Sequence, residues 1–405
     1  MDVLSSGAPA EQRKNCLSEV HAKVSFVTHG EMERPMKPSV VLVFAVLTAT
    51  FSCILETQSS QAQLSVGATT QYVIQFPRDL YDHPQFQTEW WYFTGNLTSR
   101  QNREYGFELT FFRGYAPTGA PAGQPQVIPI IFADLAVSDL HGQRFHFQKE
   151  LAPEGAPLAS ITPEPWTIQL GGWTLTEPDS TSGVFRLEAQ QDDFGVDLAL
   201  VPEGPPVLNG KNGLFELAGS DGQGPEYYEY YSIPRMQAEG SIEVDGQQIA
   251  VRGLAWNDHE FFNLGANQNF PSWDWFAIRL DDGSSIMPYG LRLPNGEYDP
   301  DSRGTFVAED GRVTHLGPGS FTLFPGQTWY SAASGAEYPI HWRIWIPSLD
   351  IDLDMSTPLN DQEMLAEPTG GSPTYWEGAS RFRGTRKGHR LEGKGYLEML
   401  GYAPQ

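Results

Sequence analysis

The chain reads Gly253-Leu-Ala-Trp-Asn-Asp-His-Glu-Phe-Phe262 and, after a polar loop, Trp273-Asp-Trp-Phe-Ala-Ile-Arg-Leu-Asp-Asp-Gly283. Carboxylates and a histidine stand here among scarce aromatic residues, although burying an unpaired charge is costly. Aromatic residues on strands also pack in ordinary cores. The stretch therefore supports two interpretations, a functional site or a packed pair of strands.

Side chains alternate between the two faces of a β-strand. In the first segment, alternation predicts that Trp256, Asp258 and Glu260 share one face and that His259 lies on the other. Two neighbouring carboxylates on one face can raise the pKa of one of them, which leaves an acid beside a base.

The second segment has the same alternation. Asp274 falls on one face with Phe276 and Ile278, an apolar face that we expect to point inward. Trp273 and Trp275 then point the opposite way. Asp274 is therefore the unusual residue of this segment.

A hairpin accounts for Asp274 without catalysis. The turn at 281–285 predicts two antiparallel strands, and pairing Leu280 with Ile286 places Asp274 opposite Arg292. A cross-strand ion pair would keep the carboxylate charged. We expect a structural pair here, and keep a catalytic Asp274 as the alternative.

Charge and cysteine content exclude several classes of function. The chain has 405 residues, enough for two domains, and a formal net charge of -24. Such a charge argues against binding of nucleic acid or anionic membranes, because both repel an acidic protein. Its two cysteines, Cys16 and Cys53, both precede the expected mature protein. Disulfides, thiolate metal sites and cysteine nucleophiles are therefore not expected.

The N-terminal 62 residues have the pattern of an export signal. Met36-Lys37 precedes the apolar run Val40–Leu55, and Ser60-Gln61-Ala62 offers small residues for signal peptidase. We expect cleavage after Ala62, with residues 1–35 belonging to an over-extended start. Export predicts a periplasmic or extracellular protein.

From residue 71 onward the pattern predicts an all-β protein. Short aromatic and β-branched runs alternate with Gly, Pro, Asn and Asp, and no long stretch keeps a helical period. Strands at this spacing are typical of barrels or sandwiches. The runs are Tyr72–Phe76, Trp90–Leu97, Phe107–Arg113, Val127–Val137, Phe185–Leu187 and Val196–Val201.

An internal repeat suggests two copies of one β-domain. The pattern of aromatic strand, polar turn and strand ending in arginine occurs at 90–113 and again at 273–292. In this alignment Asp274 takes the position of inward-facing Trp91, and Arg292 that of Arg113.

A family resemblance follows from motifs spread over nearly the whole mature chain. They are His83-Pro-x-Phe-x-Thr-Glu-Trp-Trp-Tyr-x-Thr-Gly-Asn-Leu97, Glu108-Leu-Thr-Phe-Phe-Arg113, Tyr230-Tyr-Ser-Ile233, Gly253-x-Ala-Trp-x-Asp-His-Glu260, Trp273-Asp-Trp-Phe276, Tyr338-Pro339, Gln362-Glu363, Tyr375-Trp-Glu-Gly378 and Gly395-Tyr-x-Glu398. In these the chain resembles the AttH/CrtC family, which includes carotenoid 1,2-hydratase. The resemblance implies two tandem lipocalin-like antiparallel β-barrels, which we place at 63–262 and 263–405. It departs at Asp134, where relatives have histidine.

Hydration of an isoprenoid double bond is the reaction that the resemblance implies. Alkene protonation requires a carboxylic acid kept protonated by an apolar setting, and the resulting cation favours aromatic faces. No cofactor is required. The candidate catalytic residues are Asp258, Glu260, His259 and Asp274. The candidate ligand-binding residues are Trp256, Trp273, Trp275, Tyr289, Trp91 and Tyr92, lining a barrel interior.

Two other classes of function remain as alternatives. A lipocalin-like carrier would bind an apolar ligand in the same aromatic lining without reacting with it, and Asp258, His259 and Glu260 would then bridge the barrels. A metal site is disfavoured, because strand neighbours 258–260 point to opposite faces. The expected partner is a hydrophobic small molecule such as an isoprenoid, carotenoid or lipid. Peripheral contact with a membrane stays open.

Two further clusters are weaker candidates. Glu363 and Glu377 lie near aromatic residues and suggest barrel-end hydrogen bonds or lumen positions. The basic cluster Arg381, Arg383, Arg386, Lys387 and Arg390 is expected to balance nearby carboxylates or to form a solvated face.

Overall fold

The structure is a computed structural model, and the residues it describes belong to one compact unit, Thr69–Gln405. They are 72–117, 127–177, 183–217, 226–263, 272–293, 295–300, 302–368 and 370–404. The export signal predicted at 1–62 lies outside these residues. Within them, no helix is both long and apolar enough to cross a membrane.

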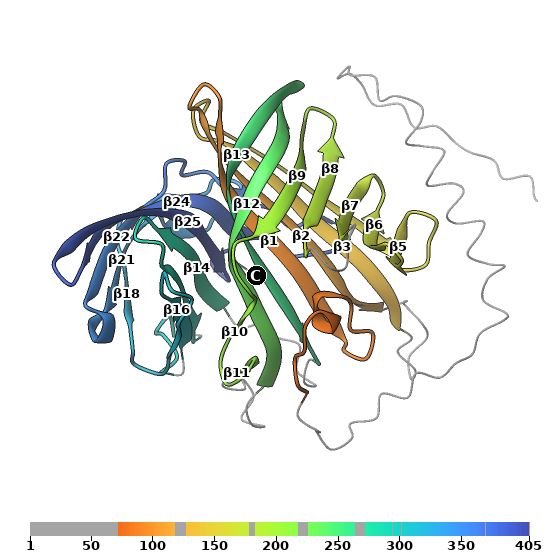
Figure 1. Cartoon of the computed structure of the whole chain (residues 1–405). Coiled ribbons are helices and arrows are strands. Elements are labelled where there is room, and N and C mark those ends of the chain that lie inside the picture. The colour runs from red at the N-terminus through yellow and green to blue at the C-terminus, as the bar shows by residue number, and fades with distance from the viewer. Residues whose placement is uncertain are drawn as a thin grey trace, which may run out of the picture. The chain divides into compact units, whose positions relative to one another are not determined.

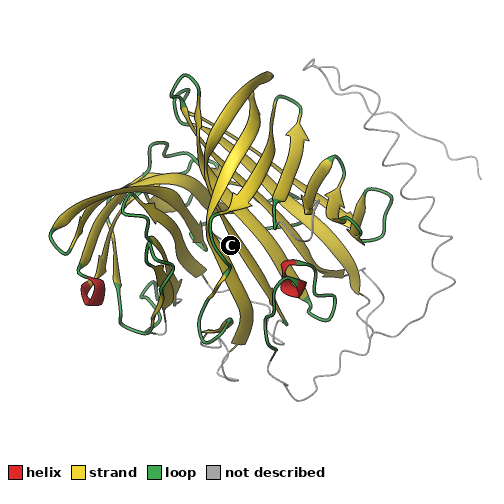
Figure 2. Ribbon diagram, viewed as in Figure 1, coloured by secondary structure: helices red, strands yellow, loops and turns green. Residues whose placement is uncertain are grey.

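Nearly all regular structure is β-strand (Figure 2). The first sheet contains β1 (Thr88–Ser99), β2 (Glu104–Pro117), β3 (Val127–Asp139), β4 (Arg144–Pro153), β5 (Ala159–Pro163), β6 (Trp166–Leu170), β7 (Trp173–Glu177), β8 (Phe185–Gln191), β9 (Phe194–Pro202), β10 (Val207–Leu208), β11 (Leu214–Leu217), β12 (Glu226–Val244) and β13 (Gln247–Phe262). The short 3-10 helices η1 (Arg78–Leu80) and η2 (Pro347–Leu349) are the described helices.

The second sheet contains β14 (Ser272–Leu280), β15 (Ser285–Arg292), β16 (Arg303–Val307), β17 (Val313–Leu316), β18 (Thr322–Pro325), β21 (His341–Ile346), β22 (Ile351–Ser356), β23 (Glu363–Met364), β24 (Tyr375–Arg386) and β25 (His389–Leu400). A separate ribbon pairs β19 (Thr328–Tyr330) with β20 (Glu337–Pro339).

The two sheets share one strand order (Figure 1). The first runs β4-β3-β2-β1-β13-β12-β9-β8-β7, continuing to β5, and the second runs β17-β16-β15-β14-β25-β24-β22-β21-β18. The first is a nearly closed barrel and the second a half-barrel. The predicted all-β fold with a duplicated, lipocalin-like β-domain is thereby confirmed, with the second barrel only half formed.

Each sheet covers its own apolar core, and a third apolar cluster joins them. Trp91, Phe93 and Phe107 belong to the core of the first sheet, and Phe276 and Ile278 to that of the second. The third cluster takes side chains from both sheets, including Tyr92, Tyr230, Trp256, Trp275 and Tyr396. The central strands β1, β13, β14 and β25 are therefore buried on both faces.

The two sheets pack closely together at Gly106 on β2. A Cβ atom built there would lie 2.3 Å from Oη of Tyr396 and 3.0 Å from Cβ of Ala379. Both of those residues belong to the second sheet. A glycine is required at this point because any side chain would force the sheets apart.

The hairpin of β14 and β15 corrects one predicted register. Ile286 pairs with Ile278 rather than Leu280, so Asp274 lies opposite Gly290. The loop is only 281–283, and Gly283 has φ of 81°, the left-handed conformation typical of a three-residue hairpin loop.

Asp274 nevertheless pairs with Arg292, diagonally across the two strands. Nε of Arg292 lies 3.3 Å from Oδ2 of Asp274, whose side chain is fully buried. The hydroxyls of Tyr298 and Tyr402 donate to the same carboxylate at 2.6 and 2.9 Å. Burial raises the pKa of Asp274 to about 6, against the lowering effects of Arg292 and the tyrosines. The geometry supports the structural interpretation of Asp274.

The predicted strand at Tyr72–Phe76 is wrong. This segment pairs with no described strand. Instead, Asp79 accepts hydrogen bonds from it. The carboxylate of Asp79 accepts from the Gln75 backbone N–H at 2.7 Å and from the Tyr72 hydroxyl at 2.9 Å. An aspartate a few residues downstream thus accepts one backbone N–H and one side-chain hydroxyl of this segment.

Replacing Asp274 with Asn should destabilise the fold and do so more at pH 5 than at pH 7.5. Removing one partner from a buried ion pair costs about 3–5 kcal/mol, but folding raises the pKa of Asp274 to about 6. The wild type therefore loses stability itself as pH rises through this value, whereas the Asn variant has no group that titrates there. Asp352→Asn is the control, since its ion pair with Arg343 is exposed and should contribute under about 1 kcal/mol. Thermal unfolding at both pH values measures the difference, and equal stability of Asp274→Asn and wild type at pH 5 would refute the structural role.

Candidate active site

The main apolar pocket lies between the two sheets and not inside either barrel. It holds about 140 Å³. Its lining includes Thr88, Trp90, Tyr92, Thr110, Phe112, Phe132, Asp258, Glu260, Trp273, Trp275, Tyr289, Gly371, Ser372, Pro373, Tyr375, Glu398 and Leu400. The candidate residues that line this pocket lie on the strand faces that meet between the sheets, and not on the faces that point into a barrel lumen.

Six carboxyl groups gather in and beside this pocket. Three of them line it, namely Asp258, Glu260 and Glu398. The others are Glu108, Asp134 and Glu377, which are buried from water. Such clustering raises pKa values, because both burial and neighbouring negative charge disfavour ionisation.

Asp258 on β13 has the most complete set of hydrogen-bond donors. The Tyr230 hydroxyl donates to Oδ2 at 2.5 Å, and Nε1 of Trp256 donates to Oδ1 at 2.6 Å. Burial raises the pKa of Asp258 to about 7, although hydrogen bonds from Ser232, Tyr230 and Trp256 lower it. Asp258 can therefore hold and release a proton near neutral pH.

Glu260 and Glu398 have fewer donors. Nε1 of Trp90 donates to Oε1 of Glu260 at 3.3 Å, and Trp273 donates to Glu398. Burial, together with the charges of Asp258 and Glu398, holds the pKa of Glu260 well above its usual range. Burial likewise raises the pKa of Glu398 to about 8. Burial therefore favours the neutral, protonated form of both side chains.

Glu377 and Glu108 extend the acid cluster away from the pocket. The Tyr92 hydroxyl donates to Oε1 of Glu377 at 2.8 Å, and the Thr110 hydroxyl donates to Glu108. Burial holds the pKa of both glutamates well above the usual range, and neighbouring acids add to the effect. The Tyr92–Glu377 hydrogen bond links the two sheets directly.

Asp134, unlike the other acids of the cluster, forms an ion pair among the described residues. Nζ of Lys149 lies 3.7 Å from Oδ2 of Asp134 and donates to Oγ of Ser372 at 2.6 Å. The hydroxyls of Ser372 and Tyr375 donate to the same aspartate oxygen. Asp134 is thus paired with a buried lysine.

Aromatic rings form most of the remaining wall. Of the predicted ligand-binding residues, Tyr92, Trp273, Trp275 and Tyr289 line the pocket. The Tyr92 and Trp275 rings meet edge to face with centroids 5.2 Å apart. Trp256 lies behind Asp258 and contacts the site through its hydrogen bond. These rings provide the electron-rich faces that stabilise a cation.

Three predicted residues lie away from the pocket, and strand alternation is the reason. His259 and Trp91 point into the first barrel, where their ring centroids lie 4.9 Å apart. Asp274 points into the core of the second sheet. Each of the three is adjacent in sequence to a residue that lines the pocket, so its side chain lies on the opposite face of the strand.

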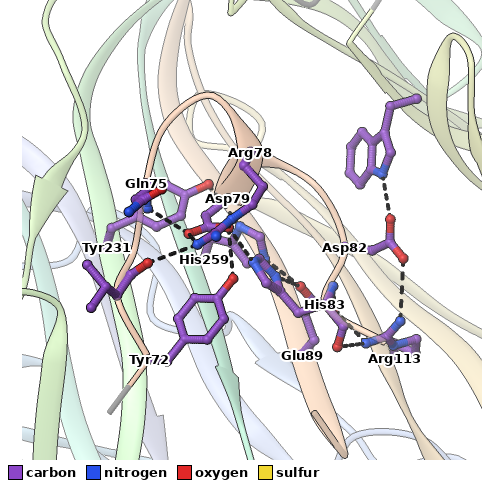
Figure 3. A network of polar contacts seen from close by, with 12 residues as sticks. Tyr72, Gln75, Arg78, Asp79, Asp82, His83, Glu89, Arg113, Tyr231 and His259 are labelled. Carbon is purple, nitrogen blue, oxygen red and sulfur yellow. Dashed lines mark hydrogen bonds and ion pairs between the residues drawn. The ribbon is translucent and has the colours of Figure 1, made fainter. Parts of the chain in front are cut away.

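A polar network surrounds His259 on that inner face (Figure 3). Oε1 of Glu89 lies 2.9 Å from Nε2 of His259 and 2.6 Å from Nδ1 of His83, and Arg113 pairs with Oε2 at 2.8 Å. Burial would raise the pKa of Glu89, but hydrogen bonds from the histidines lower it to about 2. Burial lowers the pKa of His259 to about 4.

His259 is therefore neutral, with Nε2 donating to the Glu89 carboxylate. Its Nδ1 faces the Tyr231 hydroxyl at 2.8 Å. The ligand atoms of His83, Glu89 and His259 are near enough to one another to hold a metal ion. However, hydrogen bonds already occupy these atoms, and a cation would sit beside the guanidinium of Arg113. The network joins the segment before β1 to the back of β13.

Several residues of the candidate site were not identified from the sequence. Glu398 lies in the motif Gly395-Tyr-x-Glu398. The available signal was a carboxylate close to an aromatic residue in the sequence. Tyr230 and Lys149 act through contacts with residues distant in sequence, for which no local pattern exists. Glu377, considered for a barrel lumen or a barrel-end hydrogen bond, instead lies between the sheets.

The fold and the pocket define a class of protein in which two related β-sheets enclose buried carboxylic acids within an aromatic wall. The AttH-like family model matches residues 67–402, and the chain belongs to this family.

Three proteins show the range of its similarities. An AttH protein of Nitrosomonas europaea has a crystal structure that matches with a TM-score of 0.72 and 29% identity, covering 84% of this chain and 100% of that one. Kievitone hydratase from Nectria haematococca shares the fold, with a TM-score of 0.62 and 18% identity over 82% of this chain and 94% of that one. The dehydratase asqC of Emericella nidulans is 22% identical over 226 residues, which span 53% of this chain and 60% of that protein.

The buried acids predict that the protein loses stability as pH rises from 6.5 to 8. A carboxyl whose pKa is raised on folding contributes stability at low pH, and this contribution is lost as pH rises through the folded-state value. For Asp258 and Glu398 those values are about 7 and about 8. His259, with its lowered pKa, acts in the opposite sense only below its unfolded value of 6.5.

Thermal unfolding across this range measures the effect. The double variant Asp258→Asn, Glu398→Gln should flatten the decline, whereas Asp310→Asn, at an exposed carboxyl with a lowered pKa, should leave it unchanged. A melting temperature that rises from pH 6.5 to 8 in the wild type would show that these acids are ionised in the folded protein.

Proposed function

We propose that this protein adds water to a carbon–carbon double bond of an apolar, isoprenoid-like ligand, or forms such a bond by removing water from the corresponding alcohol, without a cofactor. The observation that carries the proposal is Asp258, an acid with a pKa near neutrality in a pocket walled by aromatic rings. Alkene hydration requires both features, since a proton must be delivered to carbon and a carbocation must survive until water captures it.

Pocket size restricts the reacting group. A cavity of about 140 Å³ is close to the roughly 150 Å³ that accommodates benzene in an engineered protein core. It accepts a branched group of five or six carbons, such as the end of a prenyl chain. A whole carotenoid is far larger, so only its terminus would enter while the remainder lay outside.

Asp258 is the proton donor in this proposal. Tyr230, Trp256 and Ser232 all donate to its carboxylate, and these hydrogen bonds stabilise the charge that forms once the proton has left. Glu260 has only a long hydrogen bond from Trp90. Its conjugate base is less stabilised, so it is the weaker acid and keeps its own proton.

In the proposed reaction Asp258 gives up one proton and later takes one back, so the protein is unchanged at the end. Asp258 transfers its proton to the less substituted alkene carbon, and the tertiary cation forms against the faces of Trp275 and Tyr289. Water adds to the cation, and the Asp258 carboxylate takes the proton that this water releases. Glu260 and Glu398, as neutral acids, hydrogen-bond to the water without trapping the cation as an ester. The reverse sequence removes water from a tertiary alcohol.

The relatives support this class of reaction. One is named a dehydratase and another a hydratase, the two directions of the same chemistry. A carrier would use the aromatic wall equally well, but binding an apolar ligand does not require several buried acids, each of which costs folding free energy at neutral pH.

Asp258→Asn should reduce turnover about 10²-fold or more, the usual scale of general-acid catalysis, with little change in ligand affinity. Offering isoprenoid alkenes with a terminal trisubstituted bond in H₂¹⁸O and measuring ¹⁸O-labelled tertiary alcohol by mass spectrometry tests this. Asp274→Asn, the same substitution outside the pocket, should retain turnover below its melting temperature.

A second variant tests the role of the hydrogen bonds. Wild-type activity should fall above about pH 7 as Asp258 ionises, and Tyr230→Phe should move this limb to higher pH by removing a donor to the carboxylate. Full turnover by Asp258→Asn would exclude it as the acid. Absence of product from every alkene and tertiary alcohol offered, with tryptophan quenching that shows binding, would favour the carrier.

Export is part of the proposal and rests on the N-terminal sequence alone. Cleavage after Ala62 would release a protein beginning at Gln63 in the periplasm or medium, where it meets a hydrophobic small molecule and no nucleic acid. N-terminal sequencing of the natural protein should begin at Gln63. Recovery of an intact cytosolic chain beginning at Met1 contradicts it.

A further inference from the structure

A second, larger pocket lies between the same two sheets, around the β14 residue Arg279. It holds about 590 Å³. Its charged lining residues are Arg235, Arg279, Arg381, Arg383 and Lys394, against Glu104, Asp281 and Glu392. Five cations against three carboxylates give a local positive excess in a chain whose net charge is -24.

Arg279 is the unusual residue of this pocket. It is 4% exposed, and its Nη2 donates to the amide oxygen of Asn96 at 2.7 Å. Within the part of the chain that the structure describes, no carboxylate forms an ion pair with it, and Nη1 is buried without a hydrogen-bond partner. Burial, reinforced by the charge of Arg235, lowers the pKa of Arg279 to about 10. A buried guanidinium without a counter-ion is costly.

Arg235 contributes a second unsatisfied group from the opposite sheet. Its Nε donates to Glu203 at 2.9 Å, but its Nη1 is also buried without a partner among the described residues. Arg235 belongs to β12 of the first sheet and Arg279 to β14 of the second. Two guanidinium groups that repel each other thus line one pocket, and each has a buried N–H group without a partner among the described residues.

The carboxylates of the pocket are already engaged. Glu104 accepts from Arg381 and from Lys394, the latter at 2.5 Å. Asp281 accepts the backbone N–H of Glu392 at 3.1 Å, and the Glu392 side chain pairs with Arg390 at 2.5 Å. None of these acids neutralises Arg279.

We propose that this pocket binds a phosphate group, which bridges Arg279 and Arg235 and so joins the two sheets. Guanidinium groups bind oxyanions through paired N–H donors. A tetrahedral phosphate offers oxygens in several directions, and can therefore accept from two arginines on opposite walls, whereas a planar carboxylate matches one fork. The volume leaves room for a free hydrated ion or for a phosphate carried by a larger molecule. This inference is independent of the reaction proposed for the acid pocket.

Isothermal titration of the full chain with inorganic phosphate, at ionic strength held constant with NaCl, tests the site. Wild type should bind one phosphate saturably. Arg279→Gln should weaken binding at least tenfold, and Arg235→Gln should weaken it less because that arginine also serves Glu203. Arg343→Gln removes one positive charge from an exposed ion pair and should leave the affinity unchanged.

Thermal unfolding provides a second readout of phosphate binding, in which wild type and variant should differ. Phosphate should raise the melting temperature of wild type, because it binds only the folded protein, and should not raise that of Arg279→Gln. Without phosphate, Arg279→Gln should be at least as stable as wild type, since it removes an unpaired buried charge.

A phosphate monoester distinguishes the two sources of the group. Tighter binding of phenyl phosphate than of inorganic phosphate supports a ligand that carries the group, and equal or weaker binding supports the free ion. The proposal is overturned if neither probe binds saturably at millimolar concentration, or if Arg279→Gln binds phosphate as wild type does. These outcomes are independent of whether the protein turns over any alkene.

Discussion

Face-to-face contact of two β-sheets that both carry acids on the contacting side is the constraint on which this structure depends. The contact removes much of the water around Asp258, Glu260 and Glu398, so burial favours their neutral forms. The hydrogen bonds of Tyr230 and Trp256 oppose this effect at Asp258. Close packing at Gly106 keeps the interface tight enough for burial to outweigh those donors. A looser interface would hydrate the acids and return their pKa values toward the ordinary range.

Duplication of the β-domain explains why acids face each other across the pocket. Asp258 pairs with Tyr92 on the neighbouring strand of the first sheet, and Glu398 pairs with Trp275 at the corresponding place in the second. The alignment of Asp274 with Trp91 and of Arg292 with Arg113 follows the same register. The two copies have diverged on their inner faces, where a network around Glu89 corresponds to the Asp274 cluster. Their outer faces have retained an acid beside an aromatic ring.

The sequence predicted the strands and their alternation better than it predicted the place of the site. Alternation correctly put Trp256, Asp258 and Glu260 on one face of their strand. It also put Asp274 and Trp275 on opposite faces of theirs. It could not tell which face was the lumen, because both faces of the central strands are buried and apolar residues occupy both. Register was less secure still, since the length of the turn after Leu280 decides it, and a pairing shifted by two residues preserves every face.

Contacts between distant segments were beyond reach of sequence patterns. Lys149 reaches Ser372 across 223 positions, and Tyr92 reaches Glu377 across 285. Neither pair has a local spacing that would reveal it. The same limitation hid Arg279 and Arg235, which belong to different sheets. By contrast, Tyr72–Phe76 had a clear strand pattern, but this segment hydrogen-bonds to the nearby Asp79 and not to another strand.

The distribution of charge along β14 and β25 shows why the acid and basic ends of the interface can coexist. Glu398 pairs with Trp275 and Lys394 with Arg279, four residues further along both strands. That separation is roughly 13 Å at about 3.3 Å per residue. Two unit charges at this distance interact by about 1 kcal/mol at an effective dielectric constant near 20, against about 4 kcal/mol at 4 Å. At this separation burial, and not the charge of Arg279, determines the raised pKa of Glu398. A guanidinium placed beside the acids would ionise them and remove the proton that acid catalysis needs. Keeping Arg279 at the far end favours the protonated form of the pocket acids and leaves this arginine without a carboxylate partner among the described residues.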